Sequence, residues 1–335
     1  MMLLRKILFP FSLLYALVVR VRNYLYDTDI WESMVFQTKV ICIGNLSVGG
    51  TGKTPMVEYL LSQLQPHFKI AVLSRGYKRK SQGFLLANSD STVAELGDEP
   101  FQIHRKFPKV KVAVDADRRN GIAILEKDVQ PDLIVLDDAF QHRKVKAGLN
   151  ILLTAYGKLY SEDWYLPTGN LRDSRSAARR ADLIVVTKCP SELSEMEIVG
   201  IRERLKPRSN QKLLFATLHY ADEFPGDDQA KKLDFFMNKN VTLVTGIADP
   251  TPLTDYLKAK TLQFEHLKYT DHHSFTAAEL KLLNEKEIVL TTEKDYVRLK
   301  NKVNNLYYIP VAHQFLGNDA TILTSELKDF MKRYA

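Results

Sequence analysis

A glycine-rich segment near the start of the chain constrains the fold more than any other feature. Residues 47–54 read SVGGTGKT; they follow the apolar run 40–43 and precede the amphipathic stretch 55–65. A strand, a glycine loop and a helix in this order predict a phosphate-binding loop, because backbone N–H groups and the helix N-terminus converge there on phosphate oxygens. Ser47 stands where the strict GxxxxGK[ST] pattern has its first glycine, so the match is not literal.

The chemistry of this loop gives each of its residues an expected role. The glycines let phosphate oxygens approach the backbone closely. Lys53 is expected to reach the β- and γ-phosphates of a nucleotide, and Thr54 to bind Mg²⁺ through its hydroxyl. The expected nucleotide-binding residues are Gly49, Gly50, Thr51, Gly52, Lys53 and Thr54.

Short apolar runs alternate with amphipathic stretches along the rest of the chain. Several runs are continuous apolar blocks, as expected for strands buried on both faces. The alternation predicts an α/β fold in which helices flank a mostly parallel sheet, as in P-loop nucleotide-binding proteins. The predicted strands are 40–43, 70–73, 110–114, 133–136, 151–153 and 183–186, followed by a second series at 241–245, 262–267, 288–291 and 306–309.

A polar, turn-forming segment separates the two series of strands. Asp222, Pro225 and Gly226 lie within it, and such residues mark loops between folded units. We therefore expect an N-terminal helix at 1–26, a P-loop core at 27–215, a linker at 216–230 and a smaller C-terminal α/β subdomain at 231–335.

The first 26 residues combine positive charge with an apolar run. Arg5, Lys6, Arg20 and Arg22 border the 13 uncharged residues at 7–19, and no acidic residue is present. A membrane-spanning helix needs about 20 apolar residues, more than this run offers. Helical spacing of the apolar side chains favours a helix that lies on an anionic membrane surface. A helix packed on the domain, a secretory signal and a membrane span are the alternatives.

Acidic residues that suit phosphate chemistry follow one predicted strand and open one predicted helix. The strand at 133–136 ends in Asp137 and Asp138, which is the Walker B pattern, and either carboxylate is a candidate for holding Mg²⁺. The segment GDEP at 97–100 places Asp98 and Glu99 at the start of a helix, where Asp98 is alternatively a simple N-cap.

Paired histidines occur once, in the segment DHH at 271–273. A carboxylate with a histidine partner is the usual means of taking a proton from a hydroxyl nucleophile. Structural histidines, at the surface or in the core, are the alternative. Arg172 belongs to a basic cluster at 169–175, which is expected to bind an anionic substrate or to be a solvated charged surface.

Composition excludes several other classes of protein. The chain has 47 Lys+Arg and 40 Asp+Glu, and the resulting net charge of +7 suits an anionic partner without indicating nucleic acid. The two cysteines, Cys42 and Cys189, form no CxxC pair, which excludes a disulfide scaffold and a cysteine-rich zinc site.

In their order and spacing, these motifs resemble the tetraacyldisaccharide 4′-kinase family of the Gram-negative lipid A pathway. The resemblance extends from the N-terminal helix to about residue 300. The GGTGKTP loop and the DDAFQHR run are its most specific parts. The segments that carry the resemblance are GNLSVGGTGKTP at 44–55, SRGY at 74–77, GDEP at 97–100, DDAFQHR at 137–143, LRD at 171–173, DHH at 271–273 and TEKD at 292–295.

This resemblance implies a reaction and a location. The expected reaction transfers the γ-phosphate of ATP, with Mg²⁺, to the 4′-hydroxyl of tetraacyldisaccharide 1-phosphate and gives lipid IV-A. The expected location is the cytoplasmic face of the inner membrane, with the enzyme bound peripherally or monotopically. Neither a nucleic acid nor an obligate protein partner is implied.

The resemblance also implies roles for individual residues. Asp98 is the expected base and His272 its partner, with His273 as the alternative. Lys53 and Arg172 are expected to act on the phosphates, although Asp173 stands where the family usually has Glu. The residues expected on the metal side are Thr54, Glu99, Asp137 and Asp138.

Three rival functions follow from the same loop. A membrane-recruited regulatory ATPase would carry an extra lysine before the glycine pair, where this chain has Val48. A kinase for a soluble acceptor would not need the basic apolar N-terminus. A GTPase would need the Asn and Asp of an NKxD segment, and the nearest match, Thr187-Lys188, has neither.

Overall fold

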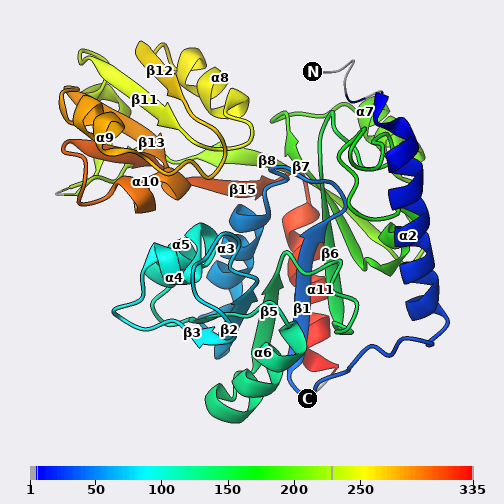
Figure 1. Cartoon of the computed structure of the whole chain (residues 1–335). Helices are drawn as coiled ribbons and strands as arrows, with labels where there is room; N and C mark the ends of the chain where they lie inside the picture. Colours follow the sequence, from blue (N-terminus) through cyan, green and yellow to red (C-terminus); the bar gives the residue numbers. More distant parts are fainter. Residues whose placement is uncertain (1–4, 6, 228, 334–335) are drawn as a thin grey trace.

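Two sheets organise the chain in the computed structural model, which describes residues 5, 7–227 and 229–333 (Figure 1). Within these residues, the large sheet has nine strands in the order β15-β8-β7-β6-β1-β5-β2-β4-β3, and a smaller sheet has four in the order β12-β11-β13-β14. The predicted α/β fold with a mostly parallel sheet is confirmed.

The large sheet is parallel except at its two edges, where β15 runs antiparallel to β8 and β3 antiparallel to β4. All six predicted strands of the first series are present, and β3, β8 and β15 are additional. The strands are β1 (Lys39–Asn45), β2 (Ile70–Ser74), β3 (Leu85–Leu86), β4 (Lys111–Val114), β5 (Leu133–Asp137), β6 (Leu149–Ala155), β7 (Leu183–Cys189), β8 (Lys212–Tyr220) and β15 (Val311–Phe315).

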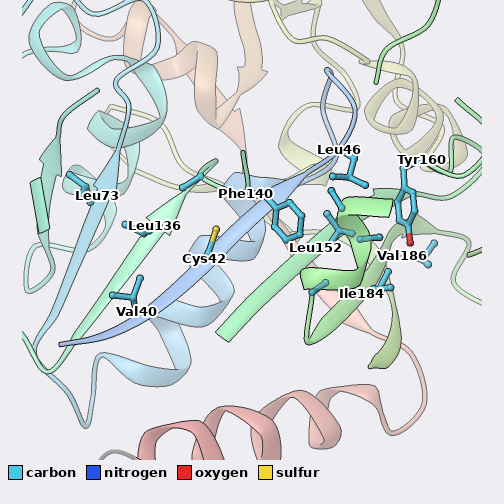
Figure 2. Close-up of a cluster of buried hydrophobic side chains, with 14 of the residues drawn as sticks. Val40, Cys42, Leu46, Leu73, Leu136, Phe140, Leu152, Tyr160, Ile184 and Val186 are labelled. Atoms are coloured by element: carbon cyan, nitrogen blue, oxygen red, sulfur yellow. The ribbon is translucent and has the colours of Figure 1, made fainter. Parts of the chain in front are cut away.

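Helices cover both faces of this sheet because its central strands are apolar on both sides. Along β1, Ile41 and Ile43 pack on one face, and Val40 and Cys42 on the other, where Figure 2 shows Cys42 among its apolar neighbours. Helices α3 (Lys53–Leu64), α5 (Asp98–Lys106) and α11 (Asp319–Lys332) cover the first face, and α6 (Arg118–Ile124) and α7 (Glu195–Leu205) the second. The shorter elements of the core are α4 (Val93–Leu96), a π-helical turn (Leu125–Val129) and a 3₁₀ helix (Arg175–Arg180).

The C-terminal subdomain repeats this design on a smaller scale. Its four parallel strands are β11 (Val241–Thr245), β12 (Phe264–Lys268), β13 (Ile288–Thr292) and β14 (Leu306–Ile309), which match the second predicted series. Its helices are α8 (Thr251–Ala259), α9 (Ala277–Asn284) and α10 (Glu293–Leu299). A small ribbon of β9 (Glu223–Phe224) and β10 (Lys231–Lys232) and a 3₁₀ turn (Leu233–Phe235) precede them.

Two adjacent strands connect this subdomain to the core. The chain leaves along β8 and returns along β15, with Val311 opposite Tyr220 and Phe315 opposite Ala216. Beyond β15, α11 packs on the large sheet through Leu323 and Phe330. The expected boundaries therefore need correction, because residues 311–333 pack with the core and the predicted linker begins inside β8. Residues 228 and 334–335 of the predicted parts lie outside the described residues.

Helix α2 (Phe9–Asp27) exposes most of its large apolar side chains, and its buried residues are Ser12, Ala16, Val19, Asn23 and Tyr26. The Ser12 hydroxyl donates to the Thr168 hydroxyl at 2.7 Å, and the Asn23 amide donates to Asp173 Oδ1 at 2.7 Å. Leu14 and Leu17 are 61% and 58% exposed. Residues 1–4 and 6 of the predicted segment 1–26 lie outside the described residues. Within the part of the chain that the structure describes, no helix has both the length and the apolar character to cross a membrane.

A charged bridge joins the core to the C-terminal subdomain. Lys106, at the end of α5, donates to Glu58 of α3 at 2.7 Å and to Glu293 of α10 at 2.8 Å. Burial, together with the charge of Glu293, raises the pKa of Glu58 to about 7. The Lys106 ammonium is therefore the cation that allows two carboxylates to lie close together in this interface.

Replacing Lys106 by Met should destabilise the protein, and more so at higher pH. Breaking a buried ion pair costs about 3–5 kcal/mol, and the 34% exposure of the Lys106 side chain reduces this to about 1–3 kcal/mol. A carboxyl whose pKa is raised by folding contributes stability that is lost as the pH rises through the folded-state value. Loss of the ammonium raises that value further, so the deficit should grow between pH 5 and pH 8.

Thermal unfolding of Lys106→Met at pH 5.5 and pH 8 measures this effect. Lys109→Met, at an exposed position beyond the same helix, is the matched control and should unfold like the unmodified protein. Adding Glu58→Gln to Lys106→Met should restore part of the loss at pH 8. An equal deficit at both pH values would contradict the account.

Candidate active site

One cavity of about 940 Å³ extends from the C-terminal subdomain past the glycine loop to helix α2. Tyr220 and Leu253 line one end, and Tyr15 and Arg22 of α2 line the other. The carboxyl ends of the parallel strands open into it, as in other open α/β sheets. The predicted residues that line this cavity are Gly49, Gly50, Thr51, Gly52, Lys53, Thr54, Glu99, Asp137, Asp138, Arg172 and His272.

The glycine loop is held in place by contacts from neighbouring strands. Gly52 is the N-cap of α3 and has a φ of +80°, a conformation that favours glycine. Its carbonyl accepts a hydrogen bond from His313 Nε2 of β15 at 2.9 Å, and a Cβ at this position would lie 2.8 Å from the same ring. The Thr187 hydroxyl of β7 donates to the Thr51 carbonyl at 2.8 Å. The loop conformation therefore depends on two strands that are remote from it in sequence.

Lys53 and Arg172 converge on Asp138. Lys53 Nζ lies 3.8 Å from Asp138 Oδ2, and Arg172 Nη1 donates to the same oxygen at 3.0 Å. Arg172 Nη2 also donates to Asp138 Oδ1 and to the Asn45 side chain. Although burial opposes the charge, Lys53 and Arg172 lower the pKa of Asp138. Asp138 is thus an ionised group held by two cations beside the loop.

The surroundings of Asp137, unlike those of Asp138, disfavour the ionised carboxylate. It is buried at the end of β5, and the Ser74 hydroxyl donates to its Oδ2 at 3.1 Å. Burial, with the charges of Glu99 and Asp138, raises the pKa of Asp137 to about 7. An added cation near Asp137 and Glu99 would relieve this repulsion. Within the described residues, no group of three or more His, Cys, Asp and Glu side chains lies close enough to hold a metal ion alone.

A second polar cluster joins the core to the C-terminal subdomain. Asp98 is the first residue of α5, and His272 lies in the loop after β12. His272 Nδ1 lies 2.6 Å from Asp98 Oδ2. Arg298 of α10 donates through Nε to Asp98 Oδ1 at 2.7 Å and through Nη2 to Oδ2. Although burial alone would raise it, the hydrogen bonds from Arg298 and His272 hold the pKa of Asp98 below its usual range.

The adjacent histidine makes different contacts. His273 Nε2 lies 3.0 Å from Glu279 Oε2 at the start of α9, and its ring stacks on Tyr269 with centroids 4.7 Å apart. Of the two histidines that the sequence left open, His272 is the one that contacts Asp98. His273 links its own loop to α9.

Sequence reasoning missed several residues of this site. Arg298 and His313 belong to none of the motifs singled out, and Lys294 was left without a role. Lys294 Nζ lies 3.0 Å from His272 Nε2. One signal was available, because Lys294 and Arg298 are four residues apart on a helix and so share one face.

Comparison with known proteins places the chain among relatives of similar length. The family model described as "Tetraacyldisaccharide-1-P 4'-kinase" matches residues 4–332. The tetraacyldisaccharide 4′-kinase of Flavobacterium johnsoniae is 49% identical over 334 residues, which cover 98% of each chain. That of Phocaeicola vulgatus is 39% identical and covers 98% of this chain and 96% of its own.

A solved structure resembles the whole chain. It is the "apo" form of LpxK from Aquifex aeolicus in complex with ATP, and it is 31% identical. The alignment covers 99% of both chains with a TM-score of 0.79.

Proposed function

We propose roles for the site residues from the premise that the chain belongs to the tetraacyldisaccharide-1-P 4′-kinase family. The chain is accordingly a kinase that uses ATP to phosphorylate the 4′-hydroxyl of tetraacyldisaccharide 1-phosphate, giving lipid IV-A in lipid A biosynthesis. The observation that best supports the assigned roles is the contact between Asp98 and His272, because His272 lines the same cavity as the glycine loop. A regulatory ATPase has no acceptor hydroxyl for such a pair to deprotonate.

The glycine loop is proposed to hold the ATP phosphates. The amides of residues 49–54 and the N-terminus of α3 offer N–H donors to phosphate oxygens, and Lys53 adds a positive charge beside them. Arg172, paired with Asp138 within reach of Lys53, is positioned to neutralise charge that develops on the transferred phosphoryl group.

Oxygen donors suited to Mg²⁺ lie next to this loop. The Thr54 hydroxyl and the carboxylates of Asp137 and Glu99 line the cavity, and the raised pKa of Asp137 indicates a site with surplus negative charge. These groups, with Asp138 nearby, would hold Mg²⁺ together with the nucleotide. The ion, when bound, would offset negative charge on the phosphates.

Asp98 is proposed to accept the proton of the acceptor 4′-hydroxyl. Its lowered pKa keeps it ionised near neutral pH, which is the state a base requires. Phosphoryl transfer passes through a loose transition state and therefore needs positioning of the hydroxyl more than a strong base. His272 holds the carboxylate from the other subdomain.

Helix α2 is proposed to bind the cytoplasmic surface of the inner membrane. Its large apolar side chains face away from the core, and in Figure 1 it lies on the opposite side of the core from the C-terminal subdomain. Arg20 is exposed on the same helix, where it can meet anionic headgroups. Since Tyr15 and Arg22 of α2 also line the cavity, an acceptor whose acyl chains lie in the bilayer can reach the glycine loop.

Transfer of labelled phosphate from γ-labelled ATP to tetraacyldisaccharide 1-phosphate in detergent micelles with Mg²⁺ tests this function. A labelled lipid product is expected, and Lys53→Ala should abolish it because the phosphates lose their cation. ATP hydrolysis without a lipid product, unaffected by the acceptor, would instead favour the regulatory ATPase.

Substitutions at Asp98 and the two histidines test the proposed base. Asp98→Asn should lower kcat by about 10²–10⁴, the usual effect of losing a general base. His272→Ala should lower kcat more than His273→Ala, because only His272 contacts Asp98. Near-normal turnover in Asp98→Asn would remove Asp98 from the role, and the reverse order of the two histidine variants would reassign the partner.

Vesicle sedimentation tests the role of α2. Leu14→Asn/Leu17→Asn should lower binding to vesicles containing anionic phospholipid by at least about tenfold, since a buried leucine contributes about 1.5–3 kcal/mol. Both side chains are exposed, so the fold should survive. Leu282→Asn, at an exposed position on α9, is the matched control. Equal binding by all three proteins would exclude the helix as the contact.

A further inference from the structure

The Asp98 carboxylate receives its hydrogen bonds from the other subdomain. Within the described residues, its hydrogen-bond partners are His272 and Arg298, and both belong to the C-terminal subdomain. Asp98 itself is on α5 of the core. The orientation of this carboxylate therefore depends on residues that contact it across the interface between the two units.

Arg298 is the more constraining of the two partners. Its Nε and Nη2 donate to the two different oxygens of Asp98, and such a two-point contact fixes the plane of a carboxylate as well as its position. Its side chain is only 9% exposed. A lysine or a histidine has no second donor in this fixed geometry.

Arg298 is itself anchored by a fully buried acid. Its Nη1 donates to Asp295 Oδ1 at 3.0 Å. Asp295 Oδ2 accepts from the Gly246 N–H at 2.7 Å and from the Thr292 hydroxyl at 2.8 Å. Because these contacts fix Asp295 at the start of α10, the guanidinium has little freedom to turn away from Asp98.

The contacts of His272 favour a proton on its Nδ1. An ionised carboxylate can only accept, so Nδ1 donates to Asp98 Oδ2, and an ammonium group can only donate, so Nε2 accepts from Lys294 Nζ at 3.0 Å. Arg298 Nη2 also lies 3.2 Å from Nδ1, but it donates to Asp98 Oδ2. Lys294 and Arg298 thus place one cation on each side of the His272 ring, from one face of α10.

These contacts leave one acceptor position open on the carboxylate. A carboxylate has about four lone-pair positions, and the donors at Asp98 occupy three of them, two on Oδ2 and one on Oδ1. The open position is on Oδ1. An acceptor hydroxyl can donate there without displacing either partner.

We propose that Arg298 is a positioning residue that holds Asp98 with Oδ1 directed at the acceptor hydroxyl, an inference that rests on the proposed role of Asp98 as base. In this arrangement the proton of the 4′-hydroxyl passes to Oδ1 while the hydroxyl oxygen bonds to phosphorus and the bond from phosphorus to the ADP oxygen breaks. Arg298 touches neither substrate; it acts through Asp98.

The separate values of kcat and KM distinguish this role from a purely structural one. Arg298→Met removes the cation that donates to both oxygens of Asp98. The kcat at neutral pH should then fall by about 10–100-fold, as when a functional side chain loses the group that orients it. The KM for each substrate should change little, because Arg298 acts through Asp98.

The experiment measures kcat and KM for both substrates of the full chain at neutral pH. Arg298→Lys should restore only part of kcat, because it keeps a charge but not the two-point contact. The double variant Asp98→Asn/Arg298→Met should be no slower than Asp98→Asn alone. Arg105→Met, at an exposed position on α5, is the matched control and should leave all parameters unchanged.

Three results would overturn the proposal. One is a kcat in Arg298→Met close to that of the unmodified protein, and another is additive loss in the double variant. The third is a rise in the KM for ATP with no change in kcat, which would make Arg298 an interface residue only.

If Arg298→Met does not fold, Arg298→Lys still decides the matter, because a kcat equal to that of the unmodified protein would show that the two-point contact is unnecessary. Near-normal turnover in Asp98→Asn would instead refute Asp98 as base, whereas an inactive Asp98→Asn with an unaffected Arg298→Met would refute this inference alone.

Discussion

Burial of the central strands on both faces is the constraint on which the site depends. Strands β1, β2 and β5 are apolar between their ends, with helices on either side, so polar and charged groups are found only where these strands begin or end. Because the strands are parallel, their carboxyl ends meet at one edge of the sheet. The glycine loop follows β1, Ser74 ends β2 and Asp137 ends β5. The parallel arrangement of the buried strands therefore also brings the site residues together.

The carboxylates gathered at this edge differ in their electrostatic state. Asp138 and Asp98 are paired with guanidinium groups, which hold their pKa values low. Among the residues that the structure describes, no guanidinium group pairs with Asp137, and its burial close to other acids raises its pKa. Asp98 and Asp138 are thus already neutralised by cations of the protein, whereas the surroundings of Asp137 favour an added cation.

The sequence predicted the parts of this structure that depend on local pattern. Continuous apolar runs identified the parallel strands, and the glycine loop and the Asp137–Asp138 pair were found because their spacing along the chain is diagnostic. What the sequence did not show depends on pairing between distant segments. Strand β15 is only partly buried and has no continuous apolar run, strand β8 ends in partly buried residues inside the expected linker, and Arg298 lies 200 residues from Asp98. His272 could be separated from His273 only by the direction in which each side chain points.

The connection through β8 and β15 has a consequence for how the chain folds during synthesis. Residues 221–310 form a unit inserted within the core, whose last strand and helix follow that unit in the sequence. Until residues 311–315 leave the ribosome, β8 is an edge strand with unpaired backbone groups, and the face that α11 covers is open. The inserted unit can fold first, because its four strands and its own apolar cluster are then complete. Residues 311–333 therefore complete a core whose first strand begins at Lys39.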